Sequence, residues 1–227
     1  MRTLIASCLV LLSSFASASG GFNLYVVGDA FDDTGNTLLY REVHRCDGAK
    51  TQCVIDYLDP AEARLARKAL DYRNSPHAPD VELENLLANV TKSASGSANE
   101  NQLVIDAGFD NYVRTRWYDL DSGEAVTFPF LMLGRDDPLE MRAVRSEEVC
   151  AEEALCLEVA PEAWFLRLLV PPIELTYERE TQRLLRYRGI GNLRDAEGNS
   201  PQVDIRYRYT PVSGDVAYSE AQPIITE

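Results

Sequence analysis

Histidine is the side chain that most often exchanges protons near neutral pH, and the chain has two of them, His44 and His77. Neither stands in a nucleophile elbow, a zinc-binding His-Glu-x-x-His run, a Walker loop or a dinucleotide-binding glycine pattern. His44 precedes Cys46 on a predicted strand, which favours a partly buried structural histidine. His77 lies in a loop flanked by prolines, which favours a solvated one. The sequence therefore predicts no catalytic residue.

Acidic residues form three groups that could act in catalysis or bind a metal ion. A glycosidase uses two carboxylates that folding brings together, and calcium takes a loop of alternating oxygen ligands. Residues 195–199 lack those alternating ligands and the distal glutamate. Each acidic group adjoins a predicted turn, so we expect solvated turn residues, with no metal and no cofactor. The groups are Asp29, Asp32 and Asp33; Asp136, Asp137 and Glu140; and Glu147, Glu148, Glu152 and Glu153.

Four cysteines beyond the N-terminal region are spaced in two close pairs. Cys46 and Cys53 bracket a polar turn between strand-like segments, and so do Cys150 and Cys156. Residues that face each other across a hairpin lie at disulfide distance, whereas structural zinc prefers gaps of about two to four residues between paired cysteines. Of the three possible pairings the spacing favours disulfides Cys46–Cys53 and Cys150–Cys156, with a zinc site as the alternative.

The first residues have the pattern of a secretory signal peptide. Arg2 precedes an apolar run over 4–12, and small residues follow as far as Ala18. We expect cleavage after Ala18, a periplasmic protein that begins near Ser19, and no lipid on Cys8, which lies inside the apolar run. A membrane-spanning helix needs about 20 consecutive apolar residues, and no later stretch is that long. The formal net charge of −14 disfavours nucleic acid and anionic membrane surfaces.

The chain that follows the signal peptide, residues 19–227, is expected to form a single β-rich domain. A turn rich in Asp, Gly and Asn joins the strand-like runs 22–27 and 37–43 and predicts a hairpin. Residues 173–177 and 205–209 alternate between apolar and polar with period two. Such alternation is typical of an antiparallel sheet with one buried face.

Three further segments have helical character. Residues 60–72 have good helix propensity, but their flanks, 54–58 and 69–72, resemble the two strands of a hairpin, which we favour. An apolar stripe of Phe109, Tyr112, Val113 and Trp117 predicts a helix that Asp106 caps and that runs to about Leu120. A nearly all-apolar helix is expected over 161–170. The expected fold is mainly β (α+β), a curved antiparallel sheet or half-open barrel with two or three short helices packed on or in it.

Two apolar runs carry the main functional indication. Residues 126–133 and 163–170 supply more large apolar side chains than one strand and one short helix need. They either fill a core or line a cavity for a lipid or other apolar small molecule. The candidate lining residues are Trp164, Phe165, Leu168, Phe128, Phe130 and Met132.

Seven arginines lie between residues 179 and 208. Several alternate with Tyr or Leu on predicted strands, which is typical of the solvated face of a sheet. We expect Glu174, Glu178 and Glu180 to balance them, with an anion or headgroup contact as the alternative.

Residues 28–42, 104–110 and 175–189 carry a family resemblance. They resemble a group of uncharacterised exported proteobacterial proteins over most of residues 22–209, and that group has no established activity to carry over. More distantly, a sheet interrupted by helices resembles the half-open barrel of the LolA/LolB-like periplasmic lipoprotein carriers. This second likeness is architectural, and it implies a binding module only by analogy.

Three hypotheses on function follow. The first is an exported soluble binding module with an apolar cavity for a lipid or other hydrophobic ligand. The second is a structural or interaction protein with a filled core that acts through an envelope protein partner. The third is a hydrolase that lacks a recognisable motif.

Overall fold

The computed structural model describes residues 21–96, 102–146, 150–194 and 198–210. The predicted signal peptide and its cleavage after Ala18 lie outside these residues. The strands are β1 (Asn23–Phe31), β2 (Leu38–Cys46), β3 (Gln52–Leu58), β4 (Arg64–Asp71), β5 (Asp80–Asn85), β6 (Val90–Ala94), β7 (Val104–Ile105), β8 (Val126–Leu131), β9 (Leu139–Arg145), β10 (Ala154–Pro161), β11 (Ile173–Glu178), β12 (Leu184–Ile190) and β13 (Gln202–Tyr209). The helices are α1 (Gly108–Thr115), α2 (Trp117–Ser122) and α3 (Trp164–Arg167).

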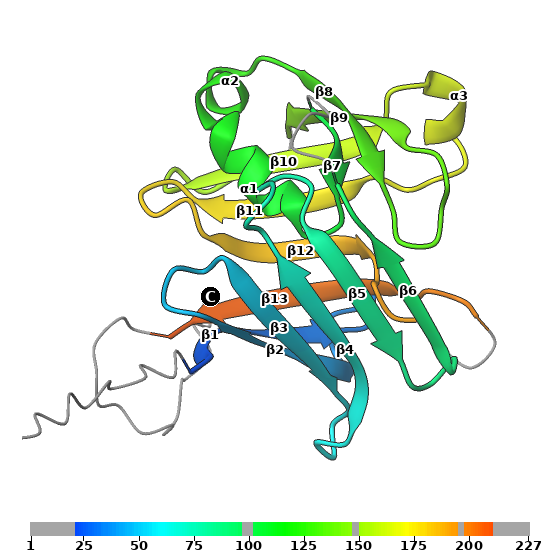
Figure 1. Ribbon diagram of the computed structural model, residues 1–227. Coiled ribbons are helices and arrows are strands. Elements are labelled where there is room, and N and C mark those ends of the chain that lie inside the picture. Colours follow the sequence, from blue (N-terminus) through cyan, green and yellow to red (C-terminus); the bar gives the residue numbers. More distant parts are fainter. Residues whose placement is uncertain (1–20, 97–101, 147–149, 195–197, 211–227) are drawn as a thin grey trace, which may run out of the picture.

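The described strands form one 13-stranded sheet, in the order β6-β5-β4-β3-β2-β1-β13-β12-β11-β10-β9-β8-β7. Neighbours are antiparallel except for β7 and β8, and β1 pairs with β13 in the middle of the sheet. The backbone N–H of Ile105 in β7 donates to the carbonyl oxygen of His77, just before β5, with an N···O distance of 2.9 Å. This bond ties β7, at one edge of the sheet, to the segment that precedes β5, the second strand from the other edge. The sheet therefore curls into a nearly closed barrel (Figure 1). The predicted mainly β class with a curved antiparallel sheet is confirmed.

Residues 54–58 and 69–72 belong to a hairpin, as predicted, because β3 and β4 pair antiparallel. The Asp59 carboxylate fixes the turn by accepting hydrogen bonds from the backbone N–H groups of Ala61 and Ala63, each at 2.8 Å. Along β4 the side chains alternate between buried and exposed, which is the period of a strand and not of a helix. The helical alternative for residues 60–72 is therefore wrong.

The helix predicted over residues 106–120 forms as two short helices, α1 and α2, which meet at Arg116. Asp106 does not cap α1 as expected. Its backbone has a φ of 44°, and its carboxylate binds Lys68 instead. Asparagine and aspartate tolerate this left-handed conformation better than most residues. The local sequence could not show that Asp106 forms an ion pair with a distant residue instead of capping the helix.

The second predicted helix, over residues 161–170, is largely absent. Strand β10 continues through Pro161, and only the four residues of α3 are helical. The Arg167 guanidinium anchors this turn, because its Nε donates to the carbonyl oxygen of Pro161 at 2.8 Å. Figure 1 shows α3 at an outer corner of the molecule, beyond the ends of the strands.

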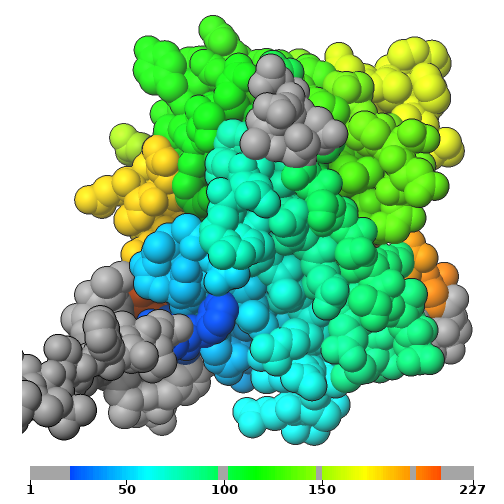
Figure 2. All heavy atoms as spheres, viewed as in Figure 1, coloured from blue at the N-terminus to red at the C-terminus, as the bar shows by residue number. Residues whose placement is uncertain are grey.

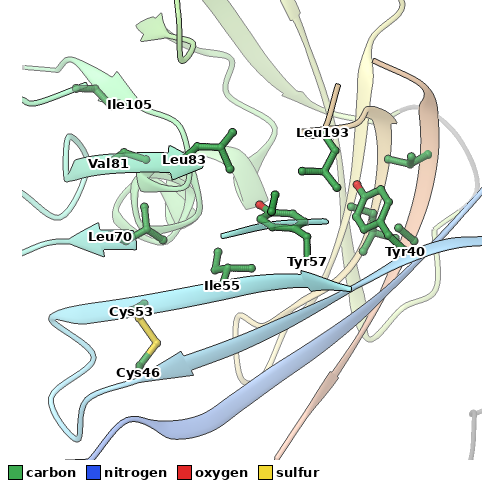
Figure 3. Close-up of a cluster of buried hydrophobic side chains, with 14 of the residues drawn as sticks. Tyr40, Cys46, Cys53, Ile55, Tyr57, Leu70, Val81, Leu83, Ile105 and Leu193 are labelled. Atoms are coloured by element: carbon green, nitrogen blue, oxygen red, sulfur yellow. A yellow bond between two sulfur atoms is a disulfide. The ribbon is translucent and has the colours of Figure 1, made fainter. Parts of the chain in front are cut away.

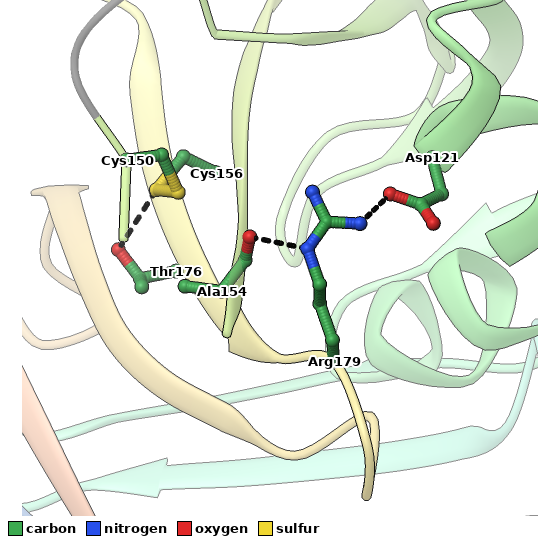
Figure 4. The surroundings of a disulfide bond; sticks show 6 residues. All are labelled: Asp121, Cys150, Ala154, Cys156, Thr176 and Arg179. Carbon is green, nitrogen blue, oxygen red and sulfur yellow. Dashed lines mark hydrogen bonds and ion pairs between the residues drawn. A yellow bond between two sulfur atoms is a disulfide. The ribbon is translucent and has the colours of Figure 1, made fainter. Parts of the chain in front are cut away.

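Both predicted disulfides are confirmed. Cys46 and Cys53 lie directly opposite each other on β2 and β3, and their bridge is part of a buried cluster that also contains Ile55 and Tyr57 (Figure 3). The Cys150–Cys156 bridge ties the segment before β10 to that strand. Figure 4 shows it beside a network in which Arg179 donates to the carbonyl oxygen of Ala154 at 2.8 Å and pairs with Asp121.

The buried side chains form two clusters on the inner face of the sheet. The first is made mainly by β2 to β5 and holds Tyr57 and Leu83. The second lies between α1 and strands β8 to β11 and holds Val113, Phe128 and Leu157. Side chains of β3 to β6, coloured cyan to green, form a continuous wall on the face shown in Figure 2.

Candidate functional site

A cavity of about 710 Å³ lies inside the barrel. Its walls are the inward-facing residues of both buried clusters, because side chains on each strand alternate between the two faces of the sheet. Three lining side chains, Val90, Met132 and Ile190, are 37, 36 and 40 % exposed. The cavity therefore opens to solvent where they lie.

One wall of the cavity is apolar and aromatic. Phe128 on β8 is buried, and its ring centre lies 5.4 Å from that of Phe109 and 4.9 Å from that of Tyr112, both on α1. The helix α1 thus packs Phe109 and Tyr112, which belong to its predicted apolar stripe, against β8. The apolar wall includes Phe109, Phe128, Phe130, Met132, Leu133, Leu139, Met141, Val159, Leu166, Val170, Ile173 and Leu175.

The structure divides the six predicted lining residues into two groups. Phe128, Phe130 and Met132 lie on the cavity wall. Trp164, Phe165 and Leu168 do not, and they are 72, 54 and 77 % exposed. The physical reason is that α3 is a single turn beyond the end of β10, so it has no sheet to cover. From the same segment, Leu166 and Val170 line the cavity, and the backbone N–H of Val170 donates to the carbonyl oxygen of Leu166 at 3.0 Å.

The opposite wall carries charged and polar groups from β2, β4 and the turn before α1. The Lys68 ammonium is 1 % exposed and donates to Asp106 Oδ1 at 2.6 Å. Glu42 is 2 % exposed, and its Oε2 accepts hydrogen bonds from His44 Nε2 and from the Tyr207 hydroxyl, both at 3.1 Å. Glu42, His44, Lys68, Asp106 and Tyr207 all line the cavity, and we call these five residues the polar pole.

The register of the sheet explains how the polar pole is assembled. One row of paired residues crosses β13, β1, β2 and β3 and consists of Tyr207, Gly28, Glu42 and Tyr57 in that order. A Cβ atom on Gly28 would lie 2.6 Å from a ring carbon of Tyr207, so only glycine lets this ring cross β1 toward Glu42. In the next row that faces the same side of the sheet, His44 on β2 and Lys68 on β4 both pair with Ile55 on β3.

Buried tyrosines surround this wall and stay protonated. Burial raises the pKa of Tyr57, Tyr187 and Tyr207, and the negative charge of Glu42 raises each of them further. The Tyr207 hydroxyl is therefore a hydrogen-bond donor to Glu42 over the whole physiological pH range. The sequence pattern did not indicate a site role for Glu42, Lys68 or Asp106. Charged residues at inward positions of the alternating strands β2 and β4 were the available indication for the first two.

The two histidines are both structural neighbours of tyrosines. His44 is partly buried, as predicted, and its ring stands edge-on to Tyr207 at 6.1 Å. His77 is not simply solvated. Its Nε2 lies 2.9 Å from Thr115 Oγ1, its ring packs on Tyr112, and burial lowers its pKa.

Four of the seven arginines lie on the outer face of the sheet, as predicted: Arg186, Arg188, Arg206 and Arg208. Arg188 pairs with Glu174 as expected, but the other three bind buried aspartates. Arg194 instead lines the cavity. Asp204 accepts hydrogen bonds from Arg186 Nε at 2.7 Å and from Arg206 at 2.9 Å. Asp29 pairs with Arg41 and Arg208. Burial opposes ionisation of Asp29, but the Arg208 and Arg41 guanidiniums outweigh it and hold the pKa below its ordinary value.

Of the acidic groups, Asp29 departs from the expected solvated turn position because β1 extends through Phe31 and places it within a strand. Asp32 is a turn residue, and hydrogen bonds from Thr37, Thr34 and Asn36 lower its pKa to about 2. Glu152 and Glu153 are exposed. Glu147 and Glu148 lie outside the described residues.

Over the described ranges, no three His, Cys, Asp or Glu side chains are placed to share a metal ion. In the same part of the chain no helix has the length and apolar character needed to cross a membrane. No protein-family model matches this chain, and no curated protein is significantly similar to it in sequence.

Proposed function

We propose that this protein is an exported binding module that holds a lipid or other hydrophobic ligand inside its barrel. The observation that carries the proposal is the cavity of about 710 Å³ with an aromatic and aliphatic wall. Ligand pockets are typically about 300–1,000 Å³ and are lined mostly by apolar side chains with a few polar groups. Both features are present here.

The cavity favours this function over an interaction protein with a filled core. Apolar side chains that face empty or watery space lose packing contacts, and this loss destabilises the fold. An apolar occupant restores those contacts and so binds favourably. The two disulfides support export to an oxidising compartment, in agreement with the expected periplasmic location. The architectural resemblance to lipoprotein carriers supports the same proposal by analogy.

One observation favours a second candidate function, contact with a partner through an apolar surface. Trp164, Phe165, Leu168 and Leu169 are large apolar side chains, and each is more than half exposed. Contiguous exposed apolar surface often marks an interaction site, and these four residues lie within six positions of the chain. This segment also contributes Leu166 and Val170 to the cavity, so a partner bound there would lie next to the ligand.

Blocking the cavity from within tests the first proposal. Leu139 lines the cavity on β9, and the neighbouring Glu140 is exposed on the opposite face of the same strand. Leu139→Trp should weaken binding of the apolar dye N-phenyl-1-naphthylamine by at least about tenfold, which is about 1.4 kcal/mol. Glu140→Trp is the matched control and should bind as the wild type does.

Fluorescence titration gives both affinities, and circular dichroism checks that each variant is folded. Equal dye binding by the two variants, or no binding by the folded wild type, contradicts the proposed function.

A further inference from the structure

The polar pole contains a buried hydrogen-bond acceptor that is not satisfied. Glu42 Oε2 accepts two hydrogen bonds, from His44 and Tyr207. Glu42 Oε1 is buried and has no hydrogen-bond partner within the described ranges. Folded proteins satisfy nearly all such groups, because an unpaired buried acceptor loses its bonds to water without replacement. Since Glu42 lines the cavity, a bound molecule can supply the missing donor.

The charges around this atom indicate what kind of donor fits. The Lys68 ammonium is already paired with Asp106 at 2.6 Å, so these two charges offset each other. The negative charge of Glu42 then remains at this part of the wall, with His44 as its direct ionisable neighbour at 3.1 Å and Tyr207 as a neutral donor. Among the described residues, the other basic residues of the lining make no hydrogen bond or ion pair with Glu42; they are Lys50, Lys92, Arg114, Arg135 and Arg194. A cationic group that donates hydrogen bonds complements the Glu42 carboxylate, whereas an anionic group placed there is repelled.

The local backbone holds the acceptor in place. Gly28 leaves room for the Tyr207 ring, and the Tyr207 hydroxyl and His44 fix Oε2 from two sides. The orientation of Glu42 is therefore set before any ligand binds, which reduces the ordering cost of binding.

We propose that the ligand is an amphiphile with a primary ammonium head, which donates a hydrogen bond to Glu42 Oε1 while its alkyl chain lies along the apolar wall. This inference rests on the proposed function, because it uses the same cavity. It adds that a fatty-acid carboxylate is disfavoured at Glu42, because it would meet the negative charge of that side chain.

Three probes with the same alkyl chain test the head group. Dodecylamine has a cationic donor head, dodecyltrimethylammonium has a cationic head without an N–H, and dodecanoate has an anionic head. Isothermal titration of the wild-type protein below the micelle concentration of each probe should give a dissociation constant for dodecylamine at least about tenfold lower than for the other two. If dodecanoate or the trimethylammonium probe binds as tightly as dodecylamine, the head-group inference is overturned and the proposed function stands. If no probe binds, both fail.

Variants locate the preference at Glu42. Glu42→Gln keeps the shape of the side chain and removes its charge, so the preference for dodecylamine over dodecanoate should fall about tenfold. The control is Glu84→Gln, an exposed position on β5, which should keep the wild-type preference. An unchanged preference in folded Glu42→Gln overturns the inference. If that variant does not fold, the wild-type comparison of the three probes decides by itself.

Discussion

Asp106→Ala should lower the free energy of unfolding by about 3–5 kcal/mol, one of the largest effects of any single substitution outside the apolar core. Lys68 is 1 % exposed, and its ammonium donates to Asp106 Oδ1 at 2.6 Å. Removing the carboxylate leaves a buried positive charge without its partner. The free-energy cost of that unpaired charge is much larger than the stabilisation that the intact pair provides. The same carboxylate also accepts a hydrogen bond from the N–H of Ala107 at 2.7 Å, which would be lost as well.

Urea unfolding of four proteins measures this effect: the wild type, Asp106→Ala, Lys68→Met, and the double variant. The double variant should be less destabilised than the sum of the single variants, because it buries no unpaired charge. Glu174→Ala is the control, since it breaks an exposed pair with Arg188 and should cost no more than about 1 kcal/mol. Equal losses in Asp106→Ala and Glu174→Ala would show that the Lys68 pair is not buried.

Phe128→Ala should destabilise the protein by about 3–5 kcal/mol, the usual cost of truncating a buried aromatic residue. The ring is 1 % exposed and packs against Phe109, Tyr112 and Phe130. Trp164→Ala is the matched truncation in the other apolar run. Because Trp164 is 72 % exposed, it should change stability by no more than about 0.5 kcal/mol.

Chemical denaturation of both variants under identical conditions gives the comparison. A larger loss for Trp164→Ala than for Phe128→Ala is incompatible with the positions of the two side chains. It would indicate that the segment around α3 packs into the molecule, as the sequence pattern predicted.

The local features of this fold could be predicted because neighbouring residues determine them. Turn residues and period-two alternation gave the β1–β2 hairpin and strands β11 and β13, and cysteine spacing gave both disulfides. The segment 161–170 could not be assigned in this way. It is apolar nearly all round, so its pattern does not distinguish burial in a helix from the end of strand β10 followed by an exposed turn.

The cavity depends on contacts between residues far apart in the chain. Glu42 and Tyr207 meet because β1 and β13 pair, and Lys68 meets Asp106 because the sheet curls and brings the residue after β7 beside β4. Neither pairing follows from local propensity. An inward-facing charge on an alternating strand, such as Lys68 between Ala66 and Leu70, is the sequence feature that marks such a site.

The most direct test of the binding function is native mass spectrometry of protein purified without detergent, followed by extraction into organic solvent. We expect a fraction of the wild-type protein to carry an added mass, and a hydrophobic compound of that same mass to appear in the extract. Leu139→Trp should lack both. A folded wild-type protein that shows only the polypeptide mass, and that takes up no dodecylamine when it is supplied, would contradict the account.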